Sequence, residues 1–382
     1  MRTARLLAPA LAAAGAALAL GAVVMRPGES RQAAGAVWSP FVLVAGLLLV
    51  GAVADADGLF AAAGNLAARL PGSDLRLYVA LMAVAAVVTA VLNLDTSVLF
   101  LTPVLVGAAR SRGADEARFV YGSVFMANAA SLLLPGSNLT NLLVLAHAPV
   151  SGATFAARMF AIWMAAVVVT GTAVAFLCRG DRETSSRPPS VPPRRRVRRH
   201  GALGPLAVAA VVVVVLATPS PALPVLAIGV AAAVAAVTST RLTAKRALEV
   251  LNPLVLGGLF GVSVAAGTLG RAWVGPARLL GSAGRVETAA VAAVGVVVLN
   301  NLPAAALGAA RPVVHPRALL IGLNLGPNLA VTGSLSAVLW MQVARRMDCP
   351  VSARRFTRLG LVVVPLSIAA ALLVGSLGPG RT

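Results

Sequence analysis

The sequence predicts an all-α polytopic membrane protein with an inverted-topology repeat, two re-entrant hairpins and two discontinuous helices. Three observations lead to this fold class. Hydrophobic residues make up 59% of the chain against 12% charged residues, which is more apolar surface than a water-soluble domain can bury. Long blocks carry no charge at all, as at 41–54, 203–218 and 361–374. Polar, helix-breaking residues interrupt apolar segments at matching places in the two halves of the chain.

The first apolar segments are expected to form helices at the membrane. Residues 1–24 begin with Arg2 and Arg5 and then run apolar, so they fit either a retained membrane helix or a signal peptide. Residues 37–54 form a span, because ~20 apolar residues cross a ~30 Å hydrocarbon core. The amphipathic stretch 58–70 is expected to lie along the inner surface.

A hairpin and a broken span follow. Residues 78–109 are interrupted by polar side chains over 93–97 and have arginines on both sides. Basic residues mark the cytoplasmic side, so this segment is predicted to enter the membrane from the cytoplasm and return there. Residues 119–148 are broken at 135–138, which predicts one span made of two half-helices, and 159–176 leads back inside.

The two halves are joined by a segment rich in proline and arginine. Residues 179–202 are predicted to be a cytoplasmic linker by this composition. The segment divides the chain into a first transmembrane repeat over 1–178 and a second over 203–382. The second repeat is expected to contain spans at 203–218, 222–238, 253–269 and 359–373, an outside-facing hairpin at 288–310, and a broken span at 319–343.

The two halves share short sequence strings in the same order. VLNLDTSVLF (91–100) matches VLNNLPAAAL (298–307), and both are followed by GAAR. Each half then has a broken span with paired asparagines, SNLTN (137–141) and NLGPN (324–328). Because the first hairpin enters from inside and the second from outside, this pattern predicts an inverted-topology repeat.

The breaks predict an enclosed polar site near the membrane midplane. Unpaired backbone groups would cost several kcal/mol each in lipid, so broken helices are tolerated where protein encloses them. Asp95 is the only acid deep inside an apolar hairpin, and such a carboxylate persists where it binds a cation or carries a proton. The candidate substrate- and ion-binding residues are Asn93, Asp95, Thr96, Ser97, Ser137, Asn138, Asn141, Asn300, Asn301, Asn324, Asn328, Thr332 and Ser334.

Composition also excludes several function classes. The net charge of +20 lies in short gaps between apolar blocks, so its expected partner is the lipid bilayer rather than nucleic acid. Lys245 is the single lysine, and its surroundings do not form the GxxxxGK[ST] loop that ATP binding requires. Neither an enzyme, a metal site nor a cofactor is predicted, and the two cysteines are expected to be free thiols.

Four strings carry a resemblance to a known family. They are NLDTSVLFLTPVLVGAAR (93–110), SNLTN (137–141), LNNLPAAALGA (299–309) and LNLGPNLAVTGSLSAVLWMQVARR (323–346). With them the chain resembles the arsenite/antimonite efflux permeases, within the ion-transporter superfamily that also holds citrate, dicarboxylate and sodium/proton carriers. The sequence departs from that pattern in having one fewer span before the first hairpin than before the second.

The resemblance implies a transporter of the bacterial plasma (inner) membrane. It implies export of arsenite or antimonite driven by protons, a homodimer, and in some systems a soluble ATPase partner. The absence of Arg and Lys at both predicted tips argues against a citrate or dicarboxylate carrier. A sodium/proton antiporter is the other reading, since Asp95 would serve it equally well.

Overall fold

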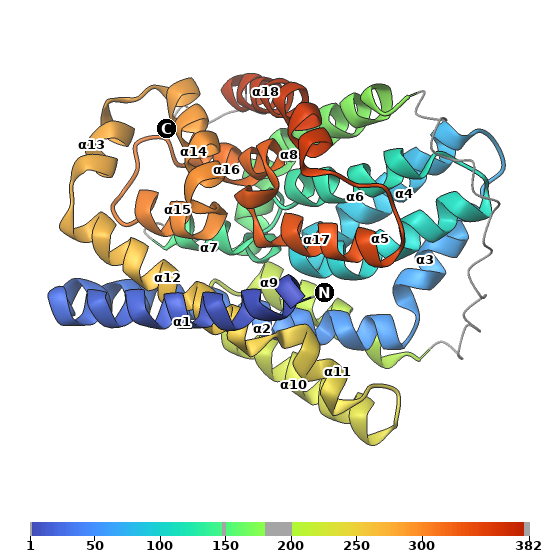
Figure 1. The fold of residues 1–382 in the computed structure, drawn as a ribbon, viewed down its shortest axis with the longest axis horizontal. Coiled ribbons are helices and arrows are strands. Elements are labelled where there is room, and N and C mark those ends of the chain that lie inside the picture. The colour runs from blue at the N-terminus through green and yellow to red at the C-terminus, as the bar shows by residue number, and fades with distance from the viewer. Residues whose placement is uncertain (1, 147–149, 180–200, 378–382) are drawn as a thin grey trace.

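The computed structural model describes residues 2–146, 150–179 and 201–377, and the secondary structure in these ranges consists of helices joined by turns and loops (Figure 1). Six helical stretches among the described residues are long and apolar enough to cross a membrane. The predicted all-α polytopic fold class is therefore confirmed. Most of the predicted linker, 180–200, lies outside the described residues.

The first half contains one hairpin and one discontinuous helix. Its elements are α1 (Arg2–Met25), α2 (Pro27–Ala56), α3 (Leu59–Ala68), α4 (Asp74–Val91), α5 (Leu94–Ser111), α6 (Glu116–Ala130), η1 (Pro135–Ser137), α7 (Leu139–Leu145) and α8 (Gly152–Leu177). Helices α4 and α5 form the hairpin, whose tip is Leu92 and Asn93. The discontinuous helix runs through α6, η1 and α7, with its break where the sequence predicted it.

The second half repeats the hairpin and the discontinuous helix after five helices, two more than precede the hairpin of the first half. Its elements are α9 (Leu203–Ala217), α10 (Ala222–Thr238), α11 (Ala244–Leu251), α12 (Pro253–Ala272), α13 (Gly275–Ser282), α14 (Arg285–Leu299), α15 (Asn301–Gly308), α16 (Pro316–Leu325), η3 (Gly326–Leu329), η4 (Val331–Gly333), α17 (Leu335–Arg346) and α18 (Ala353–Leu377). Helices α14 and α15 form the second hairpin, and α16 to α17 form the second discontinuous helix.

Three features of the fold differ from the sequence prediction. Helix α2 begins at Pro27, ten residues before the predicted span, because proline suits the first helical turn. The short helices α11 and α13 were not predicted, since each has only eight residues, too few for a span. The strings 137–141 and 324–328 are not structural counterparts: the first contains the cap of a half-helix, whereas the second closes one.

Glycines allow two pairs of helices to pack backbone to backbone. Helix α1 lies against α12, and α10 lies against α2 (Figure 1). A Cβ atom at Gly258 of α12 would stand 2.6 Å from the Leu11 carbonyl oxygen of α1. A Cβ atom at Gly229 of α10 would stand 2.5 Å from the Gly46 carbonyl oxygen of α2. Small residues at such contacts are typical of membrane helix packing, and the two contacts repeat between the halves.

Helix α9 has no counterpart in the first half, and Asp57 attaches it to that half. The Asp57 carboxylate is 4% exposed. It accepts hydrogen bonds from the Gly204 backbone N–H at 2.7 Å and from the Arg241 guanidinium at 3.4 Å. Asp57 therefore joins the end of α2, the start of α9 and the turn after α10, and it lies away from both hairpin tips.

We expect Gly258→Val to lower the thermal stability of the protein, because the new side chain has no room against α1. Overpacking of this kind costs about 1–3 kcal/mol or more. Gly257→Val is the matched control, since a Cβ atom at Gly257 meets no atom within 4 Å. Thermal unfolding in detergent checks this, and equal melting temperatures for the two variants would contradict the close packing.

A second junction holds the end of the first hairpin to the loop before α18. The Arg110 guanidinium donates to both carboxylate oxygens of Glu116 at 2.8 Å and to the Met347 carbonyl oxygen at 2.7 Å. The Cys349 thiol is buried beside this pair, 3.7 Å from each partner. Cys349 and Cys178 are both free. Burial raises the pKa of the Cys349 thiol to about 11.

Because only a thiolate alkylates rapidly, we expect Cys349 to react slowly with maleimide at neutral pH. The rate should rise about tenfold per pH unit up to pH ~11, the pKa of the thiol, since the thiolate fraction rises by that factor. The measurement is mass spectrometry of the intact protein in a Cys178→Ser background. Rapid labelling of Cys349 at pH 7 would contradict the raised pKa.

Candidate functional site

One cavity receives the tips of both hairpins. It has a volume of about 430 Å³ and lies between α2, α5, α7, α11, α12, α15 and α17. Its polar lining residues are Asp95, Asn138, Arg246, Glu249, Asn252, Asn300, Asn301, Ser336, Gln342 and Arg346. The remaining lining is leucine and valine. A largely apolar cavity with a few convergent polar groups is the usual form of a small-molecule site.

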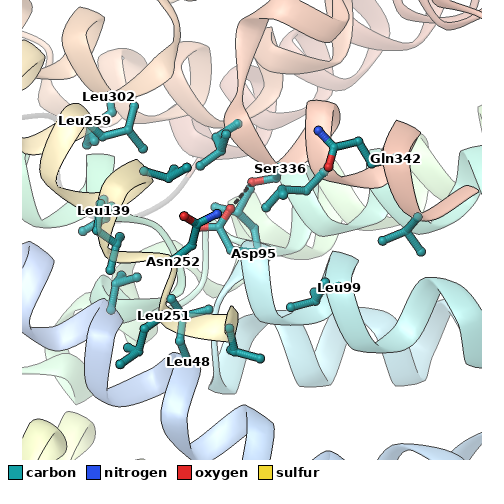
Figure 2. Close-up of a pocket in the computed structure, with 18 of the residues that line it drawn as sticks. Leu48, Asp95, Leu99, Leu139, Leu251, Asn252, Leu259, Leu302, Ser336 and Gln342 are labelled. Carbon is teal, nitrogen blue, oxygen red and sulfur yellow. Dashed lines mark hydrogen bonds between the residues drawn. The ribbon is translucent and has the colours of Figure 1, made fainter. Parts of the chain in front are cut away.

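The first tip places a carboxyl group in this cavity. The Asn93 side chain caps α5 by accepting the Thr96 backbone N–H at 2.7 Å, which sets Asp95 in the first helical turn. An anion there is favoured by the helix dipole. The Asp95 carboxylate accepts a 2.5 Å hydrogen bond from the Ser336 hydroxyl of α17 (Figure 2). This bond joins the hairpin of the first half to the discontinuous helix of the second.

The second tip presents amides and no acid. Asn300 has φ +74° and ψ 154° where the chain turns between α14 and α15, a strained conformation that residues other than glycine rarely adopt. Its side-chain amide donates to the Thr332 carbonyl oxygen at 3.1 Å. Asn301 is 7% exposed and lines the cavity. Leu302 follows where the first tip has its acid.

The two discontinuous helices are tied together where they break. Asn324 of α16 uses all its hydrogen-bonding capacity: its oxygen accepts from Ser131 at 2.6 Å and from Asn138 at 2.8 Å, and its amide donates to Asn141 at 2.8 Å and to Leu320 at 2.9 Å. Asn138 also caps α7 through the Thr140 backbone N–H. Asn324 therefore orients Asn138, which lines the cavity.

The same region pairs the backbone groups that the breaks leave open. Asn141 donates to the carbonyl oxygens of Ser131 and Leu134, and the Ser137 hydroxyl also bonds to both of these oxygens. Buried polar groups need such partners, so these side chains hold the break in shape.

A second asparagine pair closes this junction on the other side. The Asn128 amide donates to the Asn328 oxygen at 2.8 Å, and Asn328 donates to the Phe125 carbonyl oxygen. The first discontinuous helix is thereby bonded to the second through side chains from both.

The structure divides the predicted site residues into two groups. Those that line the cavity are Asp95, Asn138, Asn300 and Asn301. Those that do not line it are Asn93, Thr96, Ser97, Ser137, Asn141, Asn324, Asn328, Thr332 and Ser334. Within the second group Asn93 and Ser334 cap helices, and Thr332 is exposed. The functional role of every residue in the first group stays a prediction.

The sequence prediction missed several lining residues. Ser336 lies two residues after the cap Ser334, in the string GSLS, which parallels SNLT at 137–140; that parallel could have indicated it. Asn252 lines the same cavity as Asp95 (Figure 2). It has φ +42° between α11 and α12. No sequence signal marked Asn252, because α11 itself was not predicted.

Apart from Asp95, the charged residues in the lining belong to α11 and to the last turn of α17. Arg246 and Glu249 lie 3.8 Å apart on α11 and are about half exposed. Arg346 is exposed and ends α17. Gln342, one turn before it, also lines the cavity (Figure 2). Arg246, Glu249 and Arg346 therefore lie on elements other than those that form the hairpin tips.

An all-helical fold whose two hairpins meet at one cavity with a few convergent polar groups is typical of a polytopic membrane transporter. Residues 1–327 match the family model CitMHS, described as citrate transporter. The chain belongs to this citrate transporter family and is a secondary transporter rather than an enzyme. It is also similar to the Alcanivorax borkumensis YdaH transporter, whose crystal structure was described as having an unusual topology. That similarity has a TM-score of 0.58 at 14% identity over 90% of this chain and 86% of the other, and it supports the fold.

These comparisons confirm the broader resemblance, to the ion-transporter superfamily. They do not distinguish arsenite from citrate-type substrates, so the narrower resemblance to arsenite permeases stays a prediction.

We expect Asn324→Leu to destabilise the protein strongly. It would leave the Asn138 side-chain amide and the Asn141 side-chain oxygen without a partner, and each unpaired buried group costs about 1–3 kcal/mol. Asn65→Leu, at an exposed position of α3, is the control. Thermal unfolding in detergent compares them. If Asn324→Leu melts within a degree of the control, the junction does not depend on this amide.

Proposed function

We propose that the protein is a proton-coupled exporter of arsenite or antimonite across the bacterial plasma membrane, with Asp95 carrying the coupling proton. The observation that carries this proposal is the cavity where Asp95 meets amides and a hydroxyl from both halves. A proton on Asp95 can be exchanged for a solute held at the same cavity. Inverted repeats of this kind support alternating access.

The chemistry of the tips supports a neutral, hydroxylated substrate. Arsenite near neutral pH is an uncharged trihydroxide, whose hydroxyl groups can both donate and accept hydrogen bonds. Amide and hydroxyl side chains offer the matching groups. Among the described residues at the two tips that line the cavity, none is basic. A di- or tricarboxylate beside the Asp95 carboxylate would therefore lack a compensating cation there.

A citrate-type organic anion is the second candidate. The family name supports it, and so do Arg246 and Arg346, whose guanidinium groups bind carboxylates well. The cavity of about 430 Å³ is large enough for such an anion. A sodium/proton antiporter would use Asp95 in the same way as the exporter.

We place the linker 179–202 in the cytoplasm between the two repeats, 1–178 and 203–382. A homodimer, and a soluble ATPase partner in cells that have one, fit the proposed export.

The substrate can be decided with the purified protein in proteoliposomes that carry an imposed pH gradient. Arsenite, citrate and sodium are offered in separate arms, with a protonophore added as control. Gradient-dependent arsenite flux that the protonophore abolishes supports the proposal. Citrate flux without arsenite flux would replace it with the second candidate, and sodium flux alone would indicate an antiporter.

We expect Asp95→Asn to reduce proton-coupled flux to the level of protein-free vesicles, because the amide cannot carry the proton. Membrane insertion and melting temperature should stay near the wild-type values, since asparagine has nearly the same shape. Asp74→Asn is the matched control, because it removes an exposed acid at the start of the same hairpin. Wild-type flux in Asp95→Asn would remove Asp95 from the mechanism.

A further inference from the structure

The cavity has a buried end and an exposed end. At the hairpin tips it is lined by the buried side chains of Asn138 and Asn301. It is also lined by Arg246 and Glu249, whose side chains are about half exposed, and by Arg346, which is exposed. The cavity therefore reaches the protein surface at these three charged residues, which together form its rim.

One face of α17 connects the two ends. Residues that line the cavity recur along this helix at intervals of three or four positions: Ser336, Leu339, Gln342 and Arg346. This spacing places them on one helical face. Ser336 is bonded to Asp95 at the first tip (Figure 2). With a helical rise of 1.5 Å per residue, Arg346 lies about 15 Å further along the axis of α17 than Ser336.

The rim has more positive than negative charge. Arg246 and Glu249 lie 3.8 Å apart on α11, and an exposed pair of this kind binds its partners only weakly. Arg346 forms no ion pair with any residue in the described ranges. Gln342, one turn before Arg346, adds an amide that can donate hydrogen bonds. The rim thus offers guanidinium and amide donors to an anion.

The position of Arg346 at a helix end does not by itself account for the rim. Arg345 and Arg346 both lie in the last turn of α17 and both are exposed, and cations there complement the helix dipole. Only Arg346 lines the cavity. Arg345 therefore has the same charge and the same helical turn without the place in the cavity, which makes it the matched control.

From this arrangement we propose that the rim is a second binding site, which takes a small polycarboxylate through Arg246, Gln342 and Arg346. A guanidinium group matches a carboxylate with two parallel hydrogen bonds. The Asp95 carboxylate at the tips would oppose such an anion, but the rim holds it without bringing it to Asp95. The inference goes beyond the proposed function, because it concerns a site separate from the tips.

The test is equilibrium binding of citrate to the purified full-length protein in a non-ionic detergent, measured by isothermal titration calorimetry at low ionic strength. Wild-type protein should bind citrate, and added salt should weaken the binding because the rim is exposed. Arg346→Gln should raise the Kd about tenfold, the effect of losing one charge-assisted contact. Arg345→Gln should leave the Kd within about twofold of wild type.

Two carboxylate variants protect the result from a folding artefact and locate the anion. Glu249→Gln should lower the Kd about threefold, because it removes an exposed negative charge beside the bound anion. Tighter binding cannot result from misfolding. Asp95→Asn should leave the Kd within about twofold of wild type, because an anion at the rim lies far from the tips. A larger gain of affinity in Asp95→Asn than in Glu249→Gln would place the anion at the tips and overturn the proposal.

Three other outcomes would also overturn it: no citrate binding by the wild-type protein, an unchanged Kd in Arg346→Gln, or equal losses in Arg346→Gln and Arg345→Gln. The last would show only a general attraction to surface charge. The measurement uses neither arsenite nor a pH gradient. Failure of arsenite export therefore leaves the rim site standing, and an absence of citrate binding leaves the proposed exporter standing.

Discussion

The structure depends on the pairing of backbone groups where its helices break. A membrane helix that is interrupted exposes N–H and C=O groups that lipid cannot satisfy. Here Ser137 and Asn141 bond the open carbonyl oxygens of the first interruption, and Asn324 of the second half is bonded to three side chains of that discontinuous helix. The amide is suited to this position because it donates two hydrogen bonds and accepts two. The polar cavity exists because these breaks are held open in a fixed shape.

The sequence was most informative where one physical requirement governs a segment. Apolar length and polar interruption predicted both hairpins and both discontinuous helices. The lipid requires long apolar segments, and a broken helix requires polar residues at its break. It was less informative about α11 and α13, which are too short to satisfy the length criterion and have no long apolar block. The sequence comparison also paired the two breaks incorrectly, because it aligned asparagine with asparagine. Either asparagine or serine can cap a helix, and the structure uses Asn138 in one half and Ser334 in the other.

The sequence was also less informative about which individual residues form the candidate site. Asp95 could be found from sequence because an acid in an apolar hairpin is costly and stands out. Its partner Ser336 is 241 residues away, and a serine in a membrane helix is too common to attract notice. Conversely, Asn141, Asn324 and Asn328 looked like ligands, but their amides are fully committed to protein partners or lie apart from the cavity. A list of polar residues cannot separate ligation from internal pairing, whereas hydrogen-bond geometry can.

The attachment of α9 by Asp57 has a consequence for how the gene can change. In addition to the α1–α12 and α2–α10 packing, a carboxylate of the first half binds the start of α9 and the turn after α10. The halves therefore recognise each other through space, and the peptide between them does not have to position either one. Insertions, deletions and changes of composition in that connecting stretch should be tolerated during evolution, whereas substitutions of Asp57 should be selected against.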